Sequence, residues 1–204
     1  HLYERLEREG FAFVAGFSNA ESHRLMVGPL GRTGLRPFPW CIRLLRPVGL
    51  VKGVLGGEGA DPTPLEVSAV ERGGLSVAPC NLDEGRVDSL WDRVATRVRV
   101  GAVRDRAFNV SRFGTRPEAG YRALAVEKEG QLAAWAVHRT ISIRRQCATF
   151  VVDLQVAPGE RESGQVLLDT LARAARKHGA TLLSALLPGE GEAREALRSN
   201  GFWQ

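Results

Sequence analysis

Apolar and polar residues alternate from Cys147 to Val156, and apolar residues then recur every three or four positions from Gly164 to His178. The first pattern predicts a β-strand, and the second predicts an amphipathic helix. The strand is expected to place Ala148, Phe150, Val152, Leu154 and Val156 on one face and Thr149, Val151, Asp153 and Gln155 on the other. A turn from Ala157 to Ser163 joins the two elements. Such a unit directs backbone N–H groups and the positive end of a helix at one point, which suits phosphate, although an ordinary α/β core contains the same unit.

The elements around this unit predict a mixed α/β sheet. A hairpin is expected from Tyr121 to Ile143, with its turn at Lys128-Glu129-Gly130. The other expected elements are extended pieces at Leu65–Val70 and Leu75–Pro79, helices from Asp83 or Asp88 to about Arg99 and from Ala102 to Phe113, a strand from Thr181 to Leu187 and a helix from Glu190 to Ser199. This order places antiparallel neighbours before a parallel crossover. The expected fold is therefore α/β (α+β), with a mixed, mainly antiparallel, twisted sheet and a β–α crossover.

The first 64 residues have a different pattern. A buried strand is expected at Phe11–Phe17, a short helix from Asn19 or Ser22 to Leu30, and a further strand at Pro37–Leu45. The stretch from Val48 to Thr63 is glycine-rich, and it ends in alternating prolines at positions 62 and 64. This is the strongest candidate boundary in the chain, so we expect one region over residues 1–64 and a second over residues 65–204.

The composition is that of a globular protein. Of the 204 residues, 44% are hydrophobic and 25% are charged, which allows one substantial core or two small ones. No apolar run approaches the roughly 20 residues that span a bilayer, and the first residues are charged and amphipathic. We therefore expect neither a membrane segment nor a signal peptide.

The charge and the cysteines limit the partners further. The net charge is +5, but the arginines are spread along the chain between acidic residues, which disfavours a nucleic-acid partner while leaving it as a third, weaker hypothesis. The three cysteines, Cys41, Cys80 and Cys147, are far apart, and the four histidines are isolated. Neither a disulfide framework nor a metal site is expected, and a reducing cytoplasm is the natural setting.

A motif follows the central strand. The sequence Asp153-Leu154-Gln155-Val156-Ala157-Pro158 is followed by Arg161-Glu162-Ser163-Gly164-Gln165-Val166 and a Leu-rich helix. This arrangement resembles the phosphate loop of the Gcn5-related N-acetyltransferase (GNAT) superfamily. Arg161 and Gly164 match the family pattern, whereas Val166 stands where a second small residue belongs. The resemblance covers roughly Leu75 to Trp203, and the segment Leu197–Phe202 is similar to the end of the family's last helix.

The first region resembles the end of another module of the same kind. Phe13–Asn19 is similar to the family's fifth strand and the start of its last helix, and Phe38–Leu45 is similar to its closing strand. The resemblance implies a two-module protein. In that interpretation residues 1–64 are the C-terminal remnant of a preceding GNAT-like module plus a linker, and residues 65–204 are a GNAT-like domain without its last strand.

The family resemblance also implies a reaction and a cofactor. In such proteins an acyl group passes from acetyl-CoA, or another acyl-CoA, to an amine of a small-molecule or peptide acceptor. The main-chain groups of Leu154 and Val156 would pair with the pantetheine arm. The pyrophosphate would lie on the loop, whose residues are Arg161, Glu162, Ser163, Gly164 and Gln165.

The catalytic groups are less well defined. Asp153 is the one carboxylate within the central strand, so it is the candidate general base, acting directly or through water. The alternative is that Asp153 is a structural residue. The family's acidic tyrosine would fall on Leu197, and neither Tyr3 nor Tyr121 replaces it. Two hypotheses therefore remain open: an active N-acyltransferase, and a catalytically degenerate module with a structural or partner-binding role.

Overall fold

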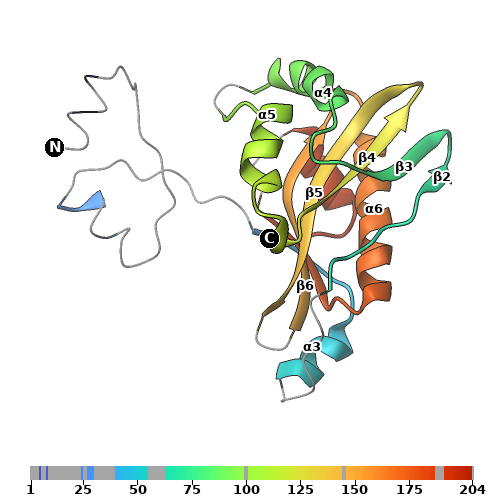
Figure 1. Ribbon diagram of the computed structural model, residues 1–204. Helices are drawn as coiled ribbons and strands as arrows, with labels where there is room; N and C mark the ends of the chain where they lie inside the picture. The colour runs from blue at the N-terminus through green and yellow to red at the C-terminus, as the bar shows by residue number, and fades with distance from the viewer. Residues whose placement is uncertain are drawn as a thin grey trace. The chain divides into compact units, whose positions relative to one another are not determined.

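The computed structural model of the protein describes residues 5, 8, 24, 27–29, 40–54, 63–98, 101–143, 146–186 and 191–203. The chain divides into two compact units, His1–Pro37 and Phe38–Gln204. The expected strand at Phe11–Phe17 lies outside the described residues, as does most of the expected helix before Leu30. The fold of the second unit is therefore the one that can be compared with the prediction (Figure 1).

The second unit contains a seven-stranded sheet in the order β1-β7-β6-β5-β4-β3-β2. The strands are β1 (Trp40–Leu44), β2 (Val70–Arg72), β3 (Leu75–Cys80), β4 (Arg122–Lys128), β5 (Gln131–Ile143), β6 (Gln146–Val156) and β7 (Leu182–Leu186). Among these strands only β6 and β7 pair in parallel, and every other neighbouring pair is antiparallel. The predicted mixed, mainly antiparallel sheet with a β–α crossover is confirmed.

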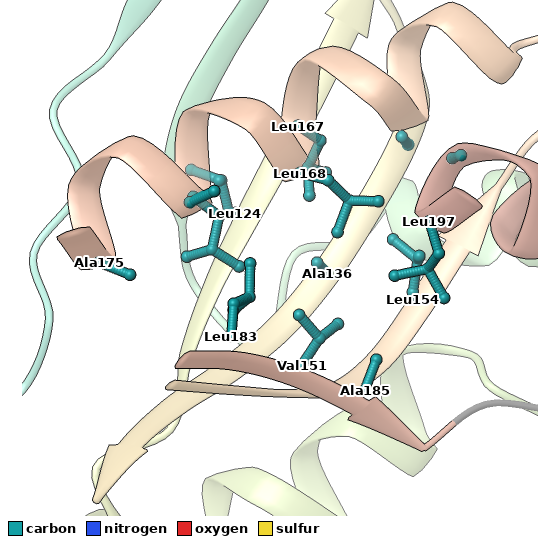
Figure 2. Close-up of a cluster of buried hydrophobic side chains, with 14 of the residues drawn as sticks. Leu124, Ala136, Val151, Leu154, Leu167, Leu168, Ala175, Leu183, Ala185 and Leu197 are labelled. Carbon is teal, nitrogen blue, oxygen red and sulfur yellow. The ribbon is translucent and has the colours of Figure 1, made fainter. Parts of the chain in front are cut away.

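Helices pack on both faces of the sheet. They are α3 (Pro47–Val54), α4 (Arg86–Ala95), α5 (Arg106–Asn109), α6 (Arg161–His178) and α7 (Glu192–Ser199), with a π-helical turn η1 (Val110–Gly114) and a 3₁₀ turn η2 (Pro117–Ala119). Leucines of α6, including Leu167 and Leu168, fill the core on one face together with Leu183 and Leu197 (Figure 2). A second cluster under α4 and η1 contains Trp135 on the opposite face. Among the helices that the structure describes, none combines the length and the hydrophobicity required to span a bilayer.

The helix expected from Ala102 to Phe113 begins later than predicted. The Asp105 carboxylate accepts a hydrogen bond from the Phe108 N–H at 2.8 Å, which makes Asp105 the N-cap of α5. Residues 101–104 precede this cap and have no regular secondary structure. The helix then continues as the wider turn η1. The N-cap was present in the sequence, but the apolar periodicity around it favoured an earlier start.

The alternation predicted for the central strand is interrupted by a β-bulge. Val137 pairs with Asp153 and the next residue, His138, pairs with Val151, so Val152 is an extra residue on β6. Val151 consequently lies in the same core as Leu154, and Val152 packs against the opposite cluster. The predicted assignment of these two valines to the faces of the sheet was wrong. Asp153 keeps its predicted place, on the face opposite Leu154.

The strand at the edge of the sheet comes from an unexpected part of the chain. We expected Phe38–Leu45 to belong to a preceding module, but β1 pairs along its whole length with β7. Cys41 and Leu45 are buried in the core under α6, and Ile42 forms a bridge with Trp203. A boundary at residue 64 therefore does not separate this strand from the sheet that contains β6.

Candidate functional site

The parallel pairing of β6 with β7 ends before β6 does. Their parallel pairing runs from Ala148 and Leu182 to Val151 and Ala185. Beyond Val151, β6 continues to Val156 and pairs only with β5 among the described strands. Within the part of the chain that the structure describes, one backbone edge of β6 is therefore left without a strand partner over residues 152–156.

Leu154 and Val156 point their main-chain groups to this open edge. The Ala157 N–H donates to the Ala133 carbonyl oxygen at 2.9 Å, at the end of the antiparallel ladder between β5 and β6. Main-chain groups of successive residues alternate between the two sides of a strand. The groups of Gln155 therefore face β5, and those of Leu154 and Val156 face away from it. These are the two residues that the sequence assigned to pantetheine binding.

The turn after β6 is shorter than expected. The Glu160 N–H donates to the Ala157 carbonyl oxygen at 3.0 Å, and Gly159 has φ of 81°, as in a type II β-turn with proline at its second position. Helix α6 begins at Arg161 rather than at Gly164. The N–H groups of Arg161, Glu162 and Ser163 thus belong to the first turn of a helix and have no acceptor within it. Such groups attract an anion to the positive helix end.

A carboxylate lies beside this helix end. Lys128 Nζ donates to Glu160 Oε1 at 3.0 Å, and the Ser163 hydroxyl donates to Glu160 Oε2 at 2.8 Å. Burial, the largest single cause, raises the pKa of Glu160, but the two hydrogen bonds and the positive charges of Lys128 and Arg93 together lower it, so the net pKa is below its ordinary value. Ser163 is buried and its hydroxyl is directed at Glu160, so a ligand would contact this residue only through its backbone N–H, which is buried as well.

The turn already binds an oxyanion of its own chain. The Gly159 N–H donates to Glu192 Oε1 at 3.1 Å, and Arg97 lies 3.7 Å from the same oxygen. Arg161 Nη2 donates to the Ser199 hydroxyl at 2.7 Å, and the Gln165 carbonyl oxygen accepts from Asn200 at 3.1 Å. Helix α7 is therefore hydrogen-bonded to both the turn and the start of α6.

Gly164 and Val166 have packing roles. A Cβ atom on Gly164 would lie 2.9 Å from Val156 Cγ2 and 3.0 Å from Ala196 Cβ. Glycine at this position lets α6 approach both β6 and α7. Val166 is 8% exposed and belongs to the core under α6. The valine that departs from the family motif is thus directed into the core.

Asp153 is held in a polar cluster on the α4 face of the sheet. It is 4% exposed, and Arg104 Nη1 donates to its Oδ1 at 3.0 Å. Gln155 Nε2 donates to the Arg104 carbonyl oxygen at 2.8 Å and lies 3.4 Å from Asp153 Oδ2. The Arg104 guanidinium carbon lies 5.4 Å from the ring centre of Trp91. Sequence reasoning missed this ion pair, because nothing local links residues that are 49 positions apart.

The other candidates lie outside this cluster. Leu197 is buried in the core under α6, so no acid replaces the family's tyrosine there. Tyr121 packs against Phe113 and accepts a hydrogen bond from Arg139. Cys147 is buried at the other end of β6, and burial raises the pKa of its thiol. Within the described ranges, no three His, Cys, Asp or Glu side chains gather into a metal site.

Comparison with protein-family models gave no match, and comparison with curated proteins gave none either. Solved structures with similar folds include an acetyltransferase from Trypanosoma brucei, with 14% identity and a TM-score of 0.45 over 64% of this chain and 93% of that one. A ribosomal-protein-alanine N-acetyltransferase from Brucella melitensis biovar Abortus 2308 has 18% identity and a TM-score of 0.43, covering 61% and 86%. A glucosamine-6-phosphate N-acetyltransferase from Arabidopsis thaliana has 14% identity and a TM-score of 0.43, covering 64% and 92%. These likenesses have TM-scores below 0.5, so the activity is argued from the residues of this chain.

Proposed function

We propose that this protein is an acyl-CoA-dependent N-acyltransferase, with acetyl-CoA as the donor. The observation that supports this proposal is the open edge of β6 at Leu154 and Val156, which is followed at once by the turn and the first N–H groups of α6. An extended amide-containing ligand and a diphosphate need these two kinds of group in this order.

The residues at this edge fit coenzyme A through their main chain. Leu154 and Val156 would pair with the amides of the pantetheine arm. The N–H groups of Arg161, Glu162 and Ser163 would hold the pyrophosphate, with Gly164 and Gln165 completing the first turns of α6. The Gly159 N–H donates to a carboxylate oxygen of Glu192, and this contact supports an oxyanion site against the turn.

Acyl transfer requires a base at the same edge. A bound acyl-CoA supplies the thioester carbon to which the amine nitrogen bonds, as the carbon–sulfur bond breaks and the thiolate leaves. The attacking amine must lose a proton, and Asp153 is the carboxylate next to Leu154 that would accept it, directly or through water. Its hydrogen bond with Arg104 would have to loosen first, because that bond occupies Oδ1.

A second proposal is that the fold has been kept without catalysis. Three observations favour it. Arg104 donates a hydrogen bond to Asp153, and the Gly159 N–H in the turn donates one to Glu192. The position of the family's acid is occupied by the buried Leu197. In this case the protein would support a preceding GNAT-like module of the same chain, or bind a partner. The amine acceptor, small-molecule or peptide, and a cytoplasmic location belong to the first proposal.

Calorimetric titration with acetyl-CoA, followed by an assay of coenzyme A release with a panel of amines, separates these proposals. Saturable binding and amine-dependent release are expected from an enzyme. Asp153→Asn should not weaken the binding and should lower the release by about a hundredfold or more, whereas Asp92→Asn, on the exposed face of α4, should change neither. Binding without release favours the second proposal. No heat at millimolar acetyl-CoA contradicts the first.

A further inference from the structure

One side chain contacts both groups that the proposed site needs. Arg104 Nη1 lies 3.0 Å from Asp153 Oδ1 and 3.5 Å from the Leu154 carbonyl oxygen. The first atom is the proposed proton acceptor, and the second lies at the open edge of β6. Arg104 therefore occupies the place at which an acyl-CoA and an amine would meet.

We propose that Arg104 is an internal ligand of the acyl-CoA site, which the pantetheine arm displaces when it binds. This inference rests on the proposed function. It makes Arg104 a specificity-determining residue. A ligand can pair with the edge of β6 only if it replaces Arg104 at the Leu154 carbonyl oxygen and releases Asp153 from Arg104. A ligand that reaches only the turn and the start of α6 does not compete with Arg104.

The contacts of Arg104 are suited to exchange. Its contact with the Leu154 carbonyl oxygen is long, at 3.5 Å, and its side chain is 21% exposed. The chain around it, residues 101–104, has no regular secondary structure. The ring of Trp91 lies beside the guanidinium and can hold it after Asp153 is released. The strongest contact, with Asp153, sets the cost of displacement.

A buried polar atom in the same cluster supports the proposal that a ligand binds there. Gln155 is 1% exposed, and its Nε2 binds the Arg104 carbonyl oxygen. Its Oε1 is buried and has no hydrogen-bond partner in the part of the chain that the structure describes. A buried acceptor without a donor is costly and is usually satisfied by a ligand or water. An N–H donor brought by a ligand to this cluster would satisfy it.

The proposal predicts opposite behaviour for two ligands. Acetyl-CoA carries the pantetheine arm, whereas 3′,5′-ADP carries only the nucleoside, its 3′-phosphate and one phosphate of the diphosphate. Removing Arg104 should tighten binding of acetyl-CoA by roughly tenfold or more, which corresponds to one hydrogen bond to a charged group. The affinity for 3′,5′-ADP should stay within about twofold, because no pantetheine competes with Arg104.

The variants are Arg104→Met and the double variant Arg104→Met with Asp153→Asn, which leaves no unpaired buried carboxylate. Arg106→Met is the matched control. Arg106 lies two positions after Arg104, its side chain is exposed, and the substitution removes the same charge. Both ligands are titrated calorimetrically into the full chain and each variant, after thermal unfolding has shown that the variant is folded. Tighter binding of acetyl-CoA alone, in both Arg104 variants and not in the control, supports the proposal.

Three results would overturn it. Weaker binding of both ligands without Arg104 would make Arg104 a phosphate contact, and unchanged binding of acetyl-CoA would show that Arg104 is not displaced. Absence of binding by every protein, wild type and variants alike, would remove the proposed function itself. The fluorescence of Trp91 gives a second measurement: acetyl-CoA should change it and 3′,5′-ADP should not, with Trp91→Phe as the blank.

Discussion

At the scale of single residues, the site is built from groups whose roles depend on distant partners. Asp153 is a buried carboxylate that is paired with Arg104. Gly164 is a helix residue that has no room for a side chain, because Val156 and Ala196 lie beside it. The contacts of Asp153 with Arg104 and of Gly164 with Ala196 join segments that are far apart in sequence. Substitutions at such positions therefore report on the geometry of the site more directly than changes in the turn itself.

Gly164 provides the first prediction. In Gly164→Ala the new methyl group would meet Val156 Cγ2 at 2.9 Å and Ala196 Cβ at 3.0 Å, so α6 or these neighbours must shift. We expect a loss of about 1–3 kcal/mol in the free energy of unfolding, measured with urea. Gly85→Ala is the control, because Gly85 has helical φ and ψ and nothing near its Cβ position, and it should change stability by less than about 0.5 kcal/mol. Equal effects would contradict the close packing of α6.

His138 provides a prediction for pH. Burial, with a smaller contribution from Arg122, lowers the pKa of His138 to about 4, so the folded protein holds it neutral while the unfolded chain protonates it near pH 6.5. Its stabilising contribution is therefore complete above about pH 6.5 and is lost as the pH falls toward 4. Between pH 7 and 4 the wild type should lose roughly 3 kcal/mol more than His138→Leu. Parallel pH profiles of unfolding free energy would refute this assignment.

At the scale of elements, the periodicity of apolar residues predicted the strands and helices with one buried face. It missed the bulge and the helix start, which do not depend on that periodicity. The hairpin of β4 and β5 and the helix α6 follow from alternation, turn residues and apolar spacing, and the structure confirms them. The bulge at Val152 was not predictable, because it depends on pairing between β5 and β6. The early start of α6 was missed because Arg161, Glu162 and Ser163 carry no apolar signal.

The contact between α7 and the turn leads to a prediction at this scale. Glu192 places a negative charge against the Gly159 N–H, where a phosphate would also be attracted. Glu192→Gln should therefore tighten binding of both acetyl-CoA and 3′,5′-ADP, by roughly two- to fivefold, in a calorimetric titration at low salt. Glu71→Gln on the far edge strand β2 removes the same charge and should have no effect. Weaker binding in Glu192→Gln would show that Glu192 does not compete with the ligand.

At the scale of the whole molecule, the sequence predicted the fold class but not which strand completes the sheet. The mixed sheet with a single parallel pair follows from the order of elements after residue 65. The place of β1 beside β7 does not, because the glycine-rich stretch after residue 48 separates them in sequence and favours a boundary. The main-chain part of the candidate site stays a prediction from the sequence, and its side-chain contacts were missed, since Arg104 and Glu192 reach it from other elements.

The place of β1 can be tested by shortening the chain. A fragment of residues 65–204 lacks β1. It therefore exposes the edge of β7 and the core residues that Cys41 and Leu45 cover in the full chain. We expect it to unfold at lower urea than a fragment of residues 38–204, with a loss of more than about 3 kcal/mol. Equal stability of the two fragments would instead favour a domain boundary at residue 64.

The central claim is that backbone amides at the open edge of β6 and the start of α6 bind coenzyme A. The most direct measurement is a titration of the isotopically labelled protein with acetyl-CoA, followed through the NMR signals of its backbone amides. The account predicts the largest shifts at Leu154, Val156 and the first turn of α6, Arg161 to Ser163. Unchanged signals at millimolar acetyl-CoA, or shifts confined to other elements, would contradict it.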